Sequence, residues 1–315
     1  MTAVLLLLAA STLFSQETGT QANQHEVYVG TYITQIFDVS LKENKFSVDF
    51  YIWFRWLGED INPLESFEVI NGQVDSKDGI YTDKIKGYNY GSCRVVATIT
   101  KFWDISEFPL DNHIMVLEIE DNENEEFKMK YLSDTENCGI NPDVRVPGWI
   151  LSKVWPKIVS HNYRTNYGDI SLPTNNESVY SRFVFSIKIV RPGYGYFFKL
   201  FFGVFIAALI AFLSFFIKPT DLDPRFGLGV GAIFAAVASE YVIASSLPDT
   251  NVLTLADKLH ILAFVFIFLS IAESVVSLRL FTTEREALSK ILDKTCFIIF
   301  IAVYVILSFL MIVLR

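Results

Sequence analysis

Four long apolar runs in the last third of the chain constrain its fold more than any other feature. They are residues 200–217, 226–247, 259–278 and 295–314. Only Glu240 and Glu273 interrupt them with an acidic charge. A helix needs about 20 apolar residues to cross the hydrocarbon core of a bilayer. The sequence therefore predicts four membrane-spanning helices, over about residues 196–217, 225–247, 256–280 and 294–314.

The connectors between these runs predict their orientation. The first and third are basic, with Lys218, Arg225, Arg279, Arg285, Lys290 and Lys294. The second, 248–258, carries Asp249 and Asp257 against Lys258. Basic connectors stay in the cytoplasm, so we expect the N-terminal region and the C-terminus to face outward.

The start of the chain resembles a secretory signal. Residues 3–10 are apolar but too few to span a bilayer. No Lys or Arg precedes them, so an apolar helix that stays attached is the alternative. A signal over 1–15, cut near Ser15 at a site the sequence does not fix, agrees with the outward orientation. We expect an outer domain over 16–192 and a membrane domain over 193–315.

The outer region has the pattern of a β protein. Its β-branched and aromatic runs are 48–56, 95–102, 113–119 and 182–190, and its turn signals are Asn71-Gly72, Asp78-Gly79 and 174–176. In the last run Phe183, Phe185, Ile187 and Ile189 alternate with polar residues such as Arg182, Ser186 and Lys188. The expected fold is an extracellular Ig-like β-sandwich of two antiparallel sheets, followed by a four-helix transmembrane bundle.

Composition excludes several classes of protein. Charged residues make up only 19% of the chain, few for a soluble protein. The net charge of −9 lies entirely within residues 16–195, which argues against a nucleic-acid partner and favours attraction of cations. The four histidines show no metal-ligand or nucleophile spacing, and no glycine-rich phosphate loop is present. We expect no enzyme activity, metal or cofactor.

The three cysteines form neither a metal pattern nor a disulfide framework. Cys296 lies in an apolar run, where a packing role is expected. Cys93 and Cys138 could pair in an oxidising compartment, and their separation in sequence does not decide it.

The segment KFWDISEFPLDNHIM, residues 101–115, resembles the signature loop of pentameric ligand-gated ion channels, or Cys-loop receptors. Asp104, Phe108, Pro109 and Asp111 match that loop, while Lys101 and Met115 stand where its cysteines would be. Bacterial members lack this disulfide, so the chain resembles a prokaryotic member. The resemblance covers about residues 25–315, including VDFYIWFRW at 48–56, the Arg191-Pro192 exit, the second apolar run with Pro248 after it, and a short third connector.

This resemblance implies a homopentamer in the bacterial inner (plasma) membrane, surrounded by lipid, with agonist sites between neighbouring outer domains. Trp56 takes the place of an aromatic on the complementary side. The principal-side candidates are Phe67, Tyr131, Tyr163, Tyr167 and Tyr180. Aromatics near acids suit a cationic amine through cation–π attraction, whereas Arg94 would instead meet a carboxylate ligand. Singly, each aromatic also fits a place in the sheet core.

The second apolar run carries a candidate pore face. Its residues are Asp223, Gly227, Gly231, Phe234, Ala238, Tyr241 and Ser245. Steps of three and four keep them on one side of a helix. Five such faces would line a pore with apolar constrictions at Phe234 and Tyr241, which close by dewetting. From spacing alone, small residues packing against another helix explain the face equally well.

Selectivity has two readings. A ring of Asp223 carboxylates favours cations and permits cation transport. Pro224-Arg225 beside Gly227 resembles anion-selective relatives, although the family commonly turns this arginine away from the pore. We expect cation selectivity, with anion selectivity as the alternative.

The resemblance also places a coupling site where the two domains meet. The turn 40–45, the loop at Phe108, Pro109 and Asp111, and Arg191 are expected to face 248–253, which begins with Pro248. We expect an Asp111–Arg191 ion pair joined by Glu43. The alternative is that Asp111 only caps its own turn.

Two further alternatives concern function. Glu240 and Glu273 are intramembrane carboxylates, either functional or bonded to a neighbouring helix. If they titrate, protons replace a small-molecule agonist and the channel is proton-gated. The other rival is a non-conducting membrane sensor with a β-sandwich ectodomain. A transporter is disfavoured because inverted repeats are not seen.

Overall fold

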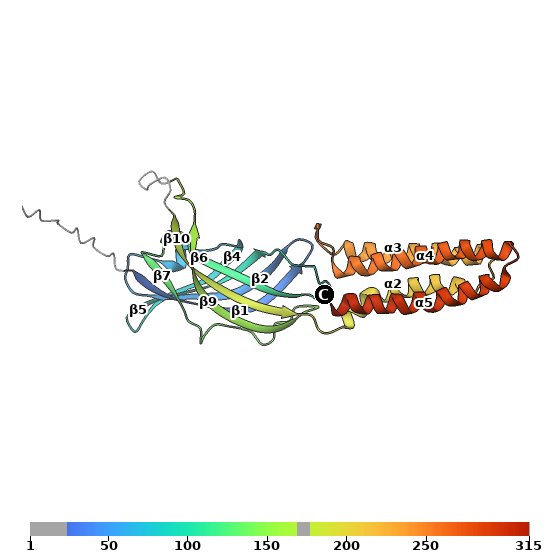
Figure 1. Ribbon diagram of the computed structural model, residues 1–315. Helices are drawn as coiled ribbons and strands as arrows, with labels where there is room; N and C mark the ends of the chain where they lie inside the picture. Colours follow the sequence, from blue (N-terminus) through green and yellow to red (C-terminus); the bar gives the residue numbers. More distant parts are fainter. Residues whose placement is uncertain (1–23, 169–176, 315) are drawn as a thin grey trace, which may run out of the picture.

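The computed structural model describes residues 24–168 and 177–314. A β domain leads into a separate bundle of long helices (Figure 1). The signal-peptide prediction for 1–15 and the turn signal at 174–176 fall outside the described residues. The strands and the short first helix are β1 (His25–Ser40), β2 (Lys45–Trp56), α1 (Pro63–Ser66), β3 (Phe67–Val69), β4 (Gly72–Ile85), β5 (Tyr88–Thr100), β6 (Asn112–Asp121), β7 (Met129–Ser133), β8 (Gly139–Ile140), β9 (Ile150–Tyr163) and β10 (Ser178–Val190).

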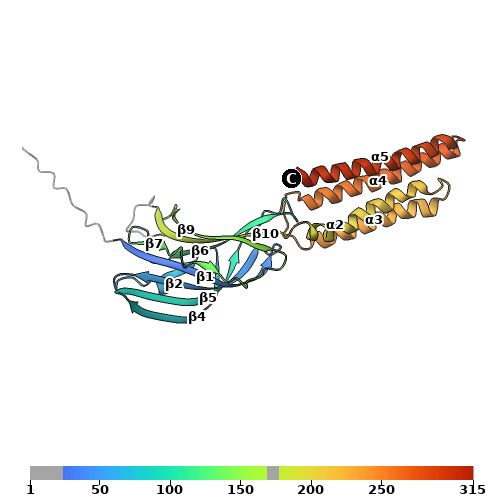
Figure 2. The ribbon, with the colours of Figure 1, turned by 90° about the horizontal axis from the view of Figure 1, so that it is seen from below.

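The strands form two layers (Figure 2). One sheet has the order β4-β5-β2-β1-β7, with β8 also beside β1, and the other has the order β3-β6-β10-β9. This confirms a β-sandwich-like N-terminal region followed by helices. The expectation of purely antiparallel sheets is wrong, because β1 pairs with β7 and β8 in parallel.

The core lies between the sheets. The predicted alternation in β10 is confirmed, with Phe183, Phe185, Ile187 and Ile189 at most 2% exposed. On the facing sheet Phe46, Val48, Phe50, Ile52 and Phe54 alternate in the same way and are equally buried. Asp78-Gly79 does not separate two strands as predicted. It lies inside β4 at a register shift against β5, where Gly79 takes a φ of 60° that glycine adopts without strain.

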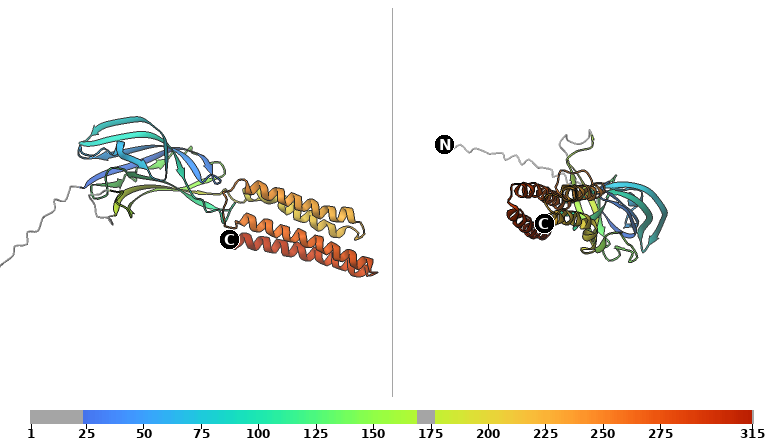
Figure 3. Two further views of the ribbon diagram at one scale, coloured as in Figure 1. Left: turned by 90° about the horizontal axis from the view of Figure 1, so that it is seen from above. Right: turned by 90° about the vertical axis from the view of Figure 1, so that its right-hand side faces the viewer.

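Four helices follow, and each is long and apolar enough to cross a membrane. They are α2 (Gly195–Leu213), extended by the 3₁₀ turn η1 (Ser214–Phe216), α3 (Leu222–Ala244), α4 (Leu255–Thr282) and α5 (Glu286–Val313). The connections α2–α3 and α4–α5 lie at the end of the bundle away from the sheets, whereas the C-terminus lies near them (Figure 3). The described chain therefore has the form of a multi-pass membrane protein.

Helix α5 begins about eight residues earlier than the sequence predicted. Its first turns are charged, which suggested a connector. The Lys290 ammonium pairs with the Glu286 carboxylate one turn away at 2.7 Å, an arrangement that supports a helix. Helix α4 begins at a capping box in which Thr254 and Asp257 exchange hydrogen bonds.

Candidate functional site

The expected Asp111–Arg191 ion pair is present at the foot of the β domain. Arg191 Nε lies 3.1 Å from Asp111 Oδ1, and their side chains are 8% and 2% exposed. His113 Nε2 contacts the other carboxylate oxygen at 2.5 Å. Burial alone would raise the pKa of Asp111, but the His113 hydrogen bond and the Arg191 charge outweigh it, so the pKa is lowered. Asp111 thus does more than cap its own turn.

Three aromatic rings surround the Arg191 guanidinium. Its carbon lies 3.6 Å from the ring centroid of Trp149, 4.9 Å from Tyr196 and 5.6 Å from Phe108. These rings come from the loop before β9, from α2 and from the signature loop. Sequence reasoning found Phe108 and missed the other two, because nothing in their local pattern marks a cation partner. The arginine therefore ties three segments by cation–π contact as well as by charge.

Hydrogen bonds join the signature loop to both domains. The Leu255 N–H at the start of α4 donates to the Ser106 carbonyl at 2.9 Å. Trp103 Nε1 donates to the Ser40 carbonyl at 3.0 Å, fixing the loop to the turn at 40–45. Pro109 follows Phe108 through a cis peptide bond within this loop. On the membrane side, Pro248 is half-buried.

The expectation that Glu43 joins this ion pair is wrong. Its carboxylate pairs with the neighbouring Lys45 at 2.5 Å in an exposed position. The hydrogen bond and charge of Lys45 lower the pKa of Glu43. The nearer cation on the same turn therefore satisfies this carboxylate.

The candidate pore face on α3 is open in the single chain. All seven of its predicted residues are exposed, with Phe234 at 70% and Tyr241 at 74%. The opposite side of α3, including Gly229, Ala232 and Ala236, is buried. A Cβ added at Gly229 would lie 2.6 Å from Ile271 Cγ1 of α4, so glycine permits this close approach.

Arg225 lies on that buried side of α3. Its side chain is fully buried, with Nη2 2.5 Å from Asp293 Oδ1 on α5 and 3.2 Å from Glu273 Oε2 on α4. Its Nη1 donates to the Ile217 carbonyl at 2.9 Å. Glu273 thus has the partner within the bundle that one alternative expected, while Glu240 is half-buried. Sequence reasoning missed Asp293, since it sits among the charges assigned to a connector.

Tyr163, Tyr167 and Tyr180 gather beside β9 and β10. The rings of Tyr167 and Tyr180 both have their centroids 5.8 Å from that of Tyr163. The Tyr163 hydroxyl donates to Glu120 at 2.9 Å, and burial together with this bond raises its pKa to about 12. Three of the predicted agonist residues therefore form one aromatic cluster that adjoins an acidic group.

The acidic group was missed by sequence reasoning. Arg182 pairs with Glu120 at 2.5 Å and with Glu118 at 2.6 Å. A usable signal was present, because Glu118 and Glu120 are two apart in β6 and share the face away from Leu117 and Ile119.

The other agonist candidates lie elsewhere. Trp56, Phe67 and Tyr131 point into the sandwich core and are 6%, 8% and 0% exposed, because each continues the inward face of its strand. Arg94 already binds a carboxylate: its Nε and Nη2 donate to Asp49 at 3.0 and 2.6 Å.

Cys93, Cys138 and Cys296 are free thiols, so Cys93 and Cys138 do not form the disulfide that the sequence left open. Within residues 24–168 and 177–314, no group of three His, Cys, Asp or Glu side chains is arranged to hold a metal. Comparison with protein-family models and with curated proteins finds no match.

Proposed function

We propose that this chain is the subunit of a homopentameric ligand-gated ion channel in which α3 lines the pore. The observation that carries the proposal is the open face of α3. It combines the charged Asp223, the hydroxyl of Ser245 and the bare backbone at Gly227 and Gly231, all exposed in the single chain.

Helix α5 provides the contrast. Its exposed residues include Ile298, Ile299, Val305, Ile306 and Phe309, the side chains suited to lipid tails. A carboxylate is unfavourable against hydrocarbon. A ring of copies that turns the α3 faces toward a shared water-filled axis removes this cost. Phe234 and Tyr241 on the same face would then form apolar rings that gate by dewetting.

Cation selectivity follows from the same helix. Arg225, the residue that favoured the anion alternative, is held by two carboxylates on the buried side. Its charge is therefore directed into the bundle, whereas Asp223 lies on the open face. An acidic ring at this end favours cations.

The tyrosine cluster is the agonist site we propose. Tyr163, Tyr167 and Tyr180 form one cluster of rings, which suits a cationic amine through cation–π attraction, while the adjoining Glu120 is held by Arg182. Binding at the edge between neighbouring outer domains would shift β9 and β10. Strand β10 leads directly to Arg191, which would carry the movement to Tyr196 on α2.

The first test is the mass of the chain purified in detergent. Five chains of 35.8 kDa predict about 180 kDa, slightly less after signal cleavage. A monomer or dimer contradicts the proposal. The second test is amine-evoked cation flux from liposomes that contain the pentamer. A stable pentamer that conducts with neither amines nor acid would favour the non-conducting sensor, and conduction with acid alone would favour a proton-gated channel.

Block of introduced cysteines by a thiol reagent tests whether the flux passes along α3. Ala238→Cys and Ser245→Cys place thiols on the proposed pore face, and Ile299→Cys places one on the exposed side of α5. A water-soluble thiol reagent should block flux through the first two and leave the third and the parent unaffected. Equal block of all three variants would remove α3 from the pore.

A further inference from the structure

Three ionisable side chains meet inside the helical bundle, and their formal charges do not balance. Arg225 of α3 faces Glu273 of α4 and Asp293 of α5, and both carboxylates lie against the same guanidinium nitrogen, Nη2. The side chains of Glu273 and Asp293 are only 5% and 9% exposed, and that of Arg225 is fully buried. With both carboxylates ionised, the cluster would carry a net negative charge.

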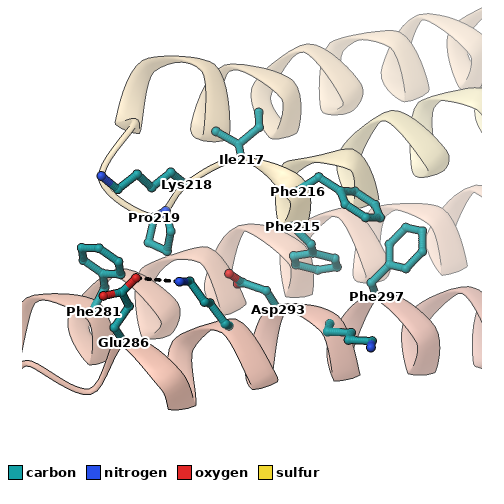
Figure 4. A pocket seen from close by; sticks show the side chains of 11 residues that line it. Phe215, Phe216, Ile217, Lys218, Pro219, Phe281, Glu286, Asp293 and Phe297 are labelled. Carbon is teal, nitrogen blue, oxygen red and sulfur yellow. Dashed lines mark ion pairs between the residues drawn. The ribbon is translucent and has the colours of Figure 1, made fainter.

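A cavity of about 540 Å³ adjoins the cluster without supplying a second cation to it. Asp293 lines this cavity together with Lys218, Lys290 and Lys294 (Figure 4). Among residues 24–168 and 177–314, none of these ammonium groups forms an ion pair with Asp293 or Glu273, and Lys290 pairs with Glu286 at 2.7 Å. The two buried carboxylates therefore share one cation.

The other ionisable groups packed around the cluster do not balance its charge. Cys296 faces both carboxylates from the next turn of α5, and its thiol is not a cation. The sequence of α2 and η1 holds one charged residue, Lys199, which lies at the end of the bundle near the sheets. The remaining charged residues at the end of the cluster are exposed: Asp221, Asp223, Arg279, Glu284 and Arg285.

Atoms of the cluster also lack part of their hydrogen bonding. In the part of the chain that the structure describes, Glu273 Oε1 and Arg225 Nε are buried without a hydrogen-bond partner. The Asp293 carboxyl nevertheless lies within hydrogen-bonding reach of the Glu273 carboxyl. Two carboxylates cannot bond to each other because both only accept, whereas a carboxyl that carries a proton donates. A proton between the two groups supplies both the missing charge and the missing donor.

We propose that Glu273 and Asp293 bind one proton between them, which makes the cluster with Arg225 electrically neutral in the folded chain. Two carboxylates that share a site do not both ionise readily, and a net charge inside a membrane domain is costly. A metal cation fits less well, because the guanidinium repels it. In the described residues, no third His, Cys, Asp or Glu ligand is arranged beside these two.

The cavity gives this proton a route to water. Asp293 belongs to the cavity lining, whereas Glu273 does not, so Asp293 is the outer member of the pair. Exchange with solvent then passes through the Asp293 carboxyl. The proton is part of the packing of α3, α4 and α5, and the proposal stands whether or not the chain conducts ions.

The first test is infrared spectroscopy of the full chain at pH 7 in a detergent without ester carbonyls. A protonated carboxyl gives a C=O stretching band that a carboxylate lacks. We expect this band in the parent and its loss in both Glu273→Gln and Asp293→Asn, because either change leaves one carboxylate for one guanidinium. Glu284→Gln removes an exposed carboxylate at the same end of the bundle and should keep the band. A band that is missing from the parent, or unchanged in both variants, would overturn the proposal.

The second test is the melting temperature of the same four chains at pH 6 and pH 9. The folded parent holds one proton that the unfolded chain, with its carboxyls ionised, releases, so its stability falls as the pH rises. The melting temperatures of the parent and Glu284→Gln should therefore fall further than those of Glu273→Gln and Asp293→Asn. Parent-like melting of both isosteric variants at pH 6 shows that they fold, and an equal fall in all four chains would contradict the bound proton.

Exchange of the salt separates a proton from a metal ion. Replacing sodium by choline at constant ionic strength should leave the melting temperature of the parent unchanged. A melting temperature that depends on sodium, and loses this dependence in Glu273→Gln, would assign the missing charge to a metal cation and overturn the proton.

Discussion

The two ends of the helical bundle each hold a buried arginine, and the two arginines differ in what surrounds them. At the end away from the sheets, Arg225 is fully buried between Glu273 and Asp293 and joins α3, α4 and α5. At the junction with the β domain, Arg191 has one carboxylate, Asp111, which it shares with His113. Aromatic rings complete its surroundings.

This difference indicates that Arg225 stabilises the fold of the bundle, whereas Arg191 connects the β domain to the helices. The helices around Arg225 also pack through apolar faces, so they form one rigid unit. Loss of the Arg225 charge should therefore destabilise the fold. The segments around Arg191 belong to two bodies. A hydrogen bond from Leu255 to Ser106 is one of the contacts between them. Removing the Arg191 pair should therefore alter coupling more than stability.

Replacing Arg225 by methionine should have the largest effect. Glu273 and Asp293 would remain buried without a cation, which costs about 3–5 kcal/mol. The measurement is the melting temperature and the folded yield of the chain in detergent.

Two further variants identify the cause. Arg225→Met/Glu273→Gln/Asp293→Asn removes all three charges and should recover most of the loss, because the penalty comes from unpaired charge. Arg279→Gln changes an exposed arginine of α4 and should behave as the parent. If Arg225→Met is as stable as the parent, the ion cluster of Arg225, Glu273 and Asp293 is not needed for the fold.

Reversal of charge at the junction should have the next largest effect. Asp111→Arg or Arg191→Asp should reduce amine-evoked flux about tenfold or more, while melting temperatures fall less than in Arg225→Met. The double swap should restore part of the flux. Recovery should be incomplete because His113 and Trp149 fit the original arrangement.

The control for this swap is Lys188→Glu, a reversal at an exposed position of β10, the strand that leads to Arg191. It should leave flux unchanged. If the double swap recovers nothing while remaining folded, the pair does not couple the domains.

Loss of the Asp223 carboxylate should have a smaller effect, confined to selectivity. Because Arg225 is neutralised on the buried side, Asp223→Ala should lower the cation-to-anion permeability ratio a few fold. Reversal potentials in a salt gradient measure this ratio. The neighbouring Asp221→Ala, which removes an exposed acid just before α3, is the matched control. An unchanged cation preference in Asp223→Ala would exclude its carboxylate from the filter.

Local sequence patterns predicted the fold, but they could not predict which distant segments pair with each other. The four helices and the alternation of β10 follow from periodicity within one element, and the structure has both. The open face of α3 was likewise predictable from its spacing. The partner of Arg225 on α5 was not, because 68 positions separate Asp293 from it and helix packing alone brings them together.

Three aromatics predicted to bind the agonist, Trp56, Phe67 and Tyr131, are buried in the core instead. Phe67 lies in a strand of three residues, and β7 with Tyr131 has five, so neither has enough alternation to fix which face is inward. Trp56 is different: the inward series Ile52, Phe54 continues to it and predicts burial. The aromatic side chain of Trp56 suggested a ligand contact, although the alternation along β2 already indicated that it lies in the core.

The smallest effect is expected at Glu68, which lies near a third arginine, Arg182. Arg182 is buried with Glu120 in the outer domain, whereas Glu68, which lies opposite Glu120 across β3 and β6, is exposed to water. Burial, Glu120 and Asp121 raise the pKa of Glu68, so its charge opposes folding at pH 7. Glu68→Gln should therefore raise stability at pH 7 by only a few tenths of a kcal/mol, since the side chain is exposed.

The sign of the pH dependence tests this reading. A carboxyl whose pKa is raised in the folded state destabilises it only when ionised, so the difference between parent and Glu68→Gln should vanish below the unfolded value of about 4.3. Thermal unfolding at pH 4 and pH 7, in low and high salt, measures it. Glu136→Gln, an exposed carboxylate outside the cluster, should show no gain. If Glu68→Gln gains as much stability as Arg225→Met loses, the number of unpaired acids, and not their burial, determines how much an unpaired charge destabilises the fold.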